Sequence, residues 1–82
     1  MTKFKLVRFV DYPFPGTRLE YFAVFLFNGK GYVFDENMKL RTFLVKRDAL
    51  VFVMDEFGLD KEYQLNEYVV EDGYVVENRV TQ

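Results

Sequence analysis

The chain has 82 residues, with thirteen acidic and eleven basic side chains, half of its positions hydrophobic and sixteen phenylalanine or tyrosine rings. This is enough for one domain over residues 1–82 with a core of its own. The absence of cysteine and histidine excludes disulfides, thiolate chemistry and imidazole chemistry. No apolar run approaches the roughly 20 residues that span a bilayer, so we expect no membrane association and a cytoplasmic protein.

The net charge of −2 conceals an uneven distribution. Residues 1–47 contain nine Lys/Arg and four Asp/Glu, whereas residues 48–82 contain two and nine. Two interpretations stay open. The two halves face each other and neutralise one another, or an acidic face steers a basic partner toward the molecule.

The first two predicted strands flank a stiff loop. Lys3–Val10 alternates apolar and basic residues at its start, as on a half-buried strand. Pro13 and Pro15 fix the backbone of the loop that follows. Leu19–Phe27 is apolar at almost every position, which predicts a central strand covered on both faces.

A three-stranded meander is predicted from turn residues. The Asn-Gly pair at 28–29 favours a tight hairpin that places Phe25 opposite Tyr32. Residues 35–37 predict a second turn, with its asparagine at positive φ. Lys39–Leu44 then returns as the third strand.

One helix is predicted within Lys46–Leu59, with its body at Ala49–Phe57 and Asp48 as the N-cap. Gly58 suits the residue after the helix because it has no Cβ to clash at positive φ. The predicted apolar stripe recurs at helical spacing and comprises Leu50, Val53, Met54 and Phe57.

A C-terminal hairpin is predicted after the helix. A turn at 72–73 would pair Val70 with Val75 and Val69 with Val76. The sequence therefore predicts an α+β fold, in which a small antiparallel sheet of five or six strands, a meander plus this hairpin, packs against one α-helix.

The chemistry available for catalysis is sparse. Serine is absent along with cysteine and histidine, so nucleophilic and general-base sites would depend on carboxylates, lysine or tyrosine. The adjacent acids Asp55 and Glu56 point in different directions on a helix. No metal-binding spacing is present. We expect neither enzymatic activity nor a cofactor or metal.

Our first functional hypothesis is a protein-interaction module, for instance a small accessory or inhibitory protein that docks on a larger partner. Phe52 lies within the polar arc of the predicted helix, which suggests a second element covering it. Acids on the helix end and the hairpin would surround it and meet a basic partner. The predicted partner-binding residues are Phe52, Asp55, Glu56, Glu67, Glu71 and Glu77.

Two alternatives remain. The run Phe27–Phe34 resembles the Lys-Gly-aromatic-x-Phe run with which RNA-recognition-motif and cold-shock sheets stack bases, and this implies single-stranded nucleic-acid binding by Lys30, Tyr32 and Phe34. The second alternative is a homodimer formed through the hairpin or the helix, since a two-stranded ribbon needs further cover.

Overall fold

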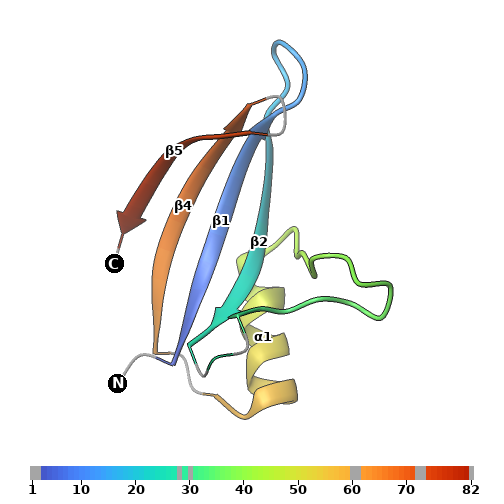
Figure 1. The fold of residues 1–82 in the computed structure, drawn as a ribbon, viewed down its shortest axis with the longest axis vertical. Coiled ribbons are helices and arrows are strands. Elements are labelled where there is room, and N and C mark those ends of the chain that lie inside the picture. The colour runs from blue at the N-terminus through green and yellow to red at the C-terminus, as the bar shows by residue number, and fades with distance from the viewer. Residues whose placement is uncertain (1–2, 28, 30, 60–61, 72–73, 82) are drawn as a thin grey trace.

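The described part of the chain folds into one five-stranded sheet and one helix (Figure 1). The computed structural model describes residues 3–27, 29, 31–59, 62–71 and 74–81, with residues 76–81 described by their backbone alone. The elements in chain order are β1 (Phe4–Tyr12), β2 (Leu19–Leu26), β3 (Gly31–Tyr32), α1 (Lys46–Phe57), β4 (Tyr63–Glu71) and β5 (Tyr74–Thr81). Over these ranges, no helix is long and apolar enough to cross a membrane.

The sheet is mixed and curves into a half-barrel with strand order β3-β2-β1-β4-β5 (Figure 1). Three neighbouring pairs are antiparallel, but β1 and β4 are parallel. The sequence predicted a wholly antiparallel sheet, and this prediction is wrong for the central pair, β1 and β4. After β3 the chain passes through α1 and returns on the far side of β1, and a crossover of this kind makes β4 run in the same direction as β1.

The helix forms where the sequence predicted it and begins three residues earlier than the predicted body. Val45 is the N-cap and makes no side-chain capping bond. Asp48, the predicted N-cap, lies instead in the first turn, where the helix dipole favours an acid. Gly58 ends the helix at φ 64°, donating its N–H to the Met54 carbonyl, as predicted.

The buried stripe of α1 contains three of the four predicted residues, because Val53 is buried and Leu50 and Phe57 pack partly buried against the core. Ala49 and Val53 are fully buried, and Phe52 packs partly buried against the core. Met54, assigned to the core by periodicity, is exposed. Phe52 is partly buried because a second element covers it beside the helix, where Phe43 packs on it at a ring separation of 5.2 Å.

The predicted meander is only partly formed. Phe25 does pair with Tyr32, but Lys39–Leu44 makes two isolated bridges, Phe22 to Phe43 and Phe34 to Leu40, instead of a strand. The Asp35 carboxylate accepts hydrogen bonds from the backbone N–H groups of residues 37 and 39, at 2.8 and 3.0 Å. This turn places the positive φ at Met38, and not at the asparagine before it.

The C-terminal hairpin forms with a register shift. Val70 pairs with Val75 as predicted, but Val69 pairs with Glu77 and not with Val76. The extra residue on β5 is a β-bulge. The predicted turn at 72–73 lies outside the described residues.

Each face of the sheet buries apolar side chains. On one face, Ala49 and Val53 of α1 cover a cluster that contains Phe4, Leu6, Phe22, Val24 and Leu26. On the opposite face, Val7 and Ala23 are fully buried, although none of the described residues forms a helix there. The prediction that β2 is covered on both sides is met by a helix on one face and by aromatic rings on the other.

Candidate docking site and aromatic sheet face

An open hollow lies between the loop after β3 and the outer side of α1. Its volume is about 500 Å³. We call it the α1 hollow, and its lining residues are Phe34, Asp35, Glu36, Asn37, Arg41, Phe52 and Glu56. Phe34 forms an exposed aromatic wall, with 58% of its surface accessible. The hollow therefore combines aromatic surface with carboxylates at its rim.

Phe52 forms the floor of the α1 hollow and also supports the fold. Its ring lies 5.2 Å from that of Phe43 and 5.7 Å from that of Phe57. The Arg41 guanidinium lies 5.2 Å from the Phe52 ring centre and 5.4 Å from that of Phe43. At this distance a cation is attracted by the negative face of an aromatic ring. The ring of Phe52 thus already contacts a cation of the same chain, Arg41.

The carboxylates around the α1 hollow have different roles. Asp35 is held in the turn by the two backbone N–H groups that it accepts. Glu36 on the loop and Glu56 on α1 are both exposed, and both line the hollow. Asp55 is exposed on α1 next to Glu56 but does not line the hollow. The rim can therefore present negative charge to a ligand.

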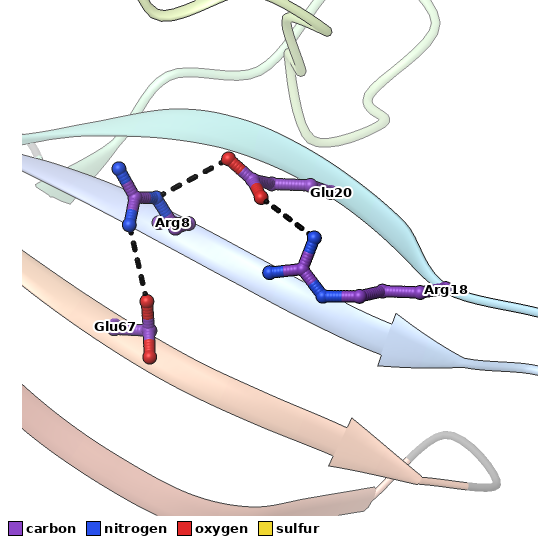
Figure 2. A network of polar contacts seen from close by, with 4 residues as sticks. All are labelled: Arg8, Arg18, Glu20 and Glu67. Atoms are coloured by element: carbon purple, nitrogen blue, oxygen red, sulfur yellow. Dashed lines mark hydrogen bonds and ion pairs between the residues drawn. The ribbon is translucent and has the colours of Figure 1, made fainter.

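The hairpin acids lie elsewhere. Glu67 accepts a hydrogen bond from Arg8 Nη1 at 3.2 Å, within a network that crosses β2, β1 and β4 (Figure 2). Arg8 Nε lies 3.4 Å from Glu20 Oε1, an ion-pair contact without hydrogen-bond geometry. Arg18 pairs with Glu20 at 3.2 Å.

The two remaining predicted acids are also separate from the α1 hollow. Glu71 lines a smaller hollow of about 350 Å³ with residues 12–16, at the end of the sheet where the loop after β1 meets the end of β4 (Figure 1). The side chain of Glu77 lies outside what the structure describes. Of the six predicted partner-binding residues, the structure brings Phe52 and Glu56 together, with Asp55 beside them.

An aromatic face covers the sheet on the side opposite α1. Tyr21, Phe9 and Tyr68 lie side by side across β2, β1 and β4, with ring separations of 5.1 and 5.6 Å. On the same face, Phe25 contacts Tyr32 at a ring separation of 4.9 Å. These rings shield the buried residues of the same face from water.

The predicted nucleic-acid residues are separated by the fold. Tyr32 belongs to the aromatic face, where it contacts Phe25. Phe34 instead lines the α1 hollow, and Lys30 lies outside the described residues. The aromatic face has its own cation, because Lys5 Nζ lies 4.6 Å from the Phe25 ring centre.

Sequence reasoning missed Glu36 and Arg41 as lining residues of the α1 hollow. Both lie in a segment that was assigned to a turn and a regular strand. The irregular path of residues 35–43 is what turns Arg41 toward Phe52. The Asp35 hydrogen bonds that produce this path could have been predicted from the sequence, because an Asp side chain in a turn commonly accepts a hydrogen bond from the backbone N–H two residues further along.

Ionisation of Tyr32 lowers the stability of the fold at alkaline pH. Burial raises the pKa of Tyr32 above its ordinary value of 10.0, and a hydrogen bond with Tyr68 adds to the rise. Above pH 10 the unfolded chain therefore loses this proton first, so stability is complete below that pH and falls as the pH rises further.

We expect Tyr32→Phe to make the alkaline loss of stability shallower, because the variant has no phenol to ionise at this position. Urea unfolding of wild type and variant at pH about 8 and about 11 checks this. Tyr74→Phe is the control, since Tyr74 is exposed. An identical alkaline loss in wild type and Tyr32→Phe would contradict the assignment.

Comparison with protein-family models, with curated proteins and with solved structures gave no match to this chain. Functional inference therefore depends on the geometry of the α1 hollow and the aromatic face.

Proposed function

We propose that this chain is a non-enzymatic protein-interaction module, a small accessory or inhibitory protein that docks on a larger partner. The partner contributes a basic segment, and the α1 hollow receives it. The observation that supports this most directly is the exposed ring of Phe34, which lines the same hollow as Phe52 and the acids Glu36 and Glu56.

The chemistry of the hollow favours a cationic anchor side chain. Arg41 already packs against Phe52 and Phe43, so the aromatic floor suits a guanidinium. A partner's arginine between Phe34 and the rim would gain a cation–π contact and a carboxylate neighbour together. Partly desolvated aromatic and arginine contacts of this kind dominate the energy of many interfaces.

The surface around the hollow offers apolar area for the rest of the partner segment. A second hollow of about 500 Å³ adjoins the first, and Arg41 and Phe52 line both. Part of the exposed apolar surface lies on the segment from residue 34 to residue 54, at Phe34, Met38, Leu44, Val45, Val51 and Met54. Exposed apolar area beside a hollow can add to an interaction site.

The test is a binding assay with short synthetic peptides matched in apolar content, in which arginine and lysine are replaced by neutral or acidic residues. We expect the basic peptides to bind most tightly and to lose affinity as salt is added. Phe34→Ala and Glu56→Lys should each weaken binding by about tenfold or more.

Matched controls come from the opposite end of the sheet. Phe14→Ala removes another exposed phenylalanine, and Glu71→Lys reverses an acid away from the α1 hollow. Both should bind like wild type. Equal binding of basic and acidic peptides, or equal effects of Phe34→Ala and Phe14→Ala, would refute the proposal.

Single-stranded oligonucleotides form a further arm of the same assay. The aromatic row of Tyr21, Phe9 and Tyr68 could stack bases, which is the second candidate function. Oligonucleotide binding that is lost in Phe9→Ala and kept in Phe34→Ala would favour this candidate over the first.

A further inference from the structure

β5 is an edge strand of the half-barrel. Within the part of the chain that the structure describes, its only sheet neighbour is β4, and its outer edge is open in Figure 1. The strand is eight residues long and contains no proline or lysine. Its first residues, Tyr74 and Val75, are exposed. An edge of this kind presents backbone N–H and C=O groups to another strand.

The sequence of β5 is complementary to itself. Residues 76–80 read Val-Glu-Asn-Arg-Val, with the same apolar residue at both ends and opposite charges on either side of Asn78. In an antiparallel pair of two copies related by a two-fold axis at Asn78, position 77 of each copy lies opposite position 79 of the other. Acid then stands opposite base twice, which is favourable cross-strand chemistry.

Charge also distinguishes this register from its neighbours. A two-fold axis at Glu77 would place that acid opposite its own copy, and an axis at Arg79 would do the same with a base. Like charges directly opposite each other destabilise a strand pair. The register at Asn78 is therefore preferred over both adjacent symmetric registers.

The charge order across the sheet leads to the same pairing. Arg8 of β1 stands in register with Glu67 of β4, and Glu67 stands in register with position 79 of β5. Arg8 and Glu67 form an ion pair. The charges at Arg8, Glu67 and Arg79 therefore alternate base, acid and base from β1 to the open edge of β5. In the register at Asn78, the residue opposite Arg79 is Glu77 of the second copy, which continues the alternation.

We infer that a second copy of this chain pairs antiparallel with β5 about a two-fold axis at Asn78, which joins two half-barrels into one continuous sheet. The bulge at Val76 ends the regular part of this ladder, so the contact is short and the dimer reversible. The dimer surface at β5 is distinct from the α1 hollow, because α1 lies beside β2 (Figure 1). The α1 hollow of each copy therefore stays open in the dimer.

Cysteine cross-linking tests the register directly, because the chain has no cysteine of its own. Asn78→Cys places the two thiols at self-opposed positions, within the Cα separation of about 4.4–6.8 Å that a disulfide requires. Glu77→Cys and Arg79→Cys are matched controls, since each would lie two residues out of register with its own copy. We expect mild oxidation to yield a covalent dimer with Asn78→Cys only. No dimer, or equal yields at all three positions, would overturn the inference.

Charge exchange is the second test, read by sedimentation over a wide range of protein concentration. Glu77→Arg alone should weaken self-association by about tenfold, because base meets base at both pairs. Arg79→Glu alone should do the same, and an equal mixture of the two variants should restore association. Phe34→Ala should dimerise like wild type, which separates this surface from the α1 hollow.

The two charge variants differ in their effect on the monomer. Arg79→Glu places an acid in register with Glu67 of its own chain, whereas position 77 stands opposite Val69. Glu77→Arg is therefore the decisive variant if Arg79→Glu fails to fold in a thermal melt. Wild-type association by Glu77→Arg would overturn the inference.

Discussion

Replacing Leu6 by alanine is expected to lower the free energy of unfolding by about 2–5 kcal/mol, the range for deleting a large buried aliphatic side chain. Leu6 is fully buried on β1, in register with Val24 of β2 and Leu65 of β4. A cavity at this place would lie under α1, where neighbouring side chains on three strands would lose contacts together. For a domain whose total stability is about 4–12 kcal/mol, the loss is a large fraction.

Leu44→Ala is the matched control, because it removes the same atoms from a side chain that is 81% exposed. Its effect should stay within about 0.5 kcal/mol. Urea unfolding monitored by fluorescence of the tyrosines gives both values under one set of conditions. Comparable losses for Leu6→Ala and Leu44→Ala would mean that the core under α1 is not packed as described.

Arg8→Met is expected to cost about 1–3 kcal/mol of stability, because it leaves two partly buried acids without the cation between them. The side chains of Arg8, Glu20 and Glu67 are 30%, 33% and 16% exposed. Arg18 pairs with Glu20 in the same network and is 55% exposed (Figure 2). Arg18→Met should therefore cost less than about 1 kcal/mol.

A double variant separates the charge effect from the packing effect. Adding Glu67→Leu to Arg8→Met removes the carboxylate that Arg8 contacts, and part of the lost stability should return. Chemical unfolding of the wild type, both single variants and the double variant closes the cycle. A double variant that is as unstable as the sum of the two single losses would contradict the role of Arg8 as the shared cation.

Local patterns predicted the elements that depend on neighbours in sequence. Helical spacing and Gly58 located α1, and the Asn-Gly turn located the pairing of Phe25 with Tyr32. The parallel contact of β1 with β4 has no such signal, since it joins segments about sixty residues apart through a crossover. Strand order cannot be read from either strand alone, and it places Glu67 beside Arg8 and away from α1.

The position of Phe52 shows how a correct observation led to an incomplete interpretation. Its place in the polar arc of the helix did indicate a second cover, and residues 41–43 supply it. Because Phe52 also contacts Phe57, a substitution there would disturb the fold together with any binding. Phe34 is the better probe of the α1 hollow, since its ring is exposed.

The most direct measurement on the proposed function is a titration of the isotope-labelled protein with an arginine-containing peptide, followed by backbone amide chemical shifts. Docking in the α1 hollow predicts shift changes concentrated at residues 34–41 and 52–56, which saturate with one affinity and disappear in Glu56→Lys. Shift changes concentrated instead at Phe9, Tyr21 and Tyr68, or spread evenly over the chain, would contradict docking in the α1 hollow.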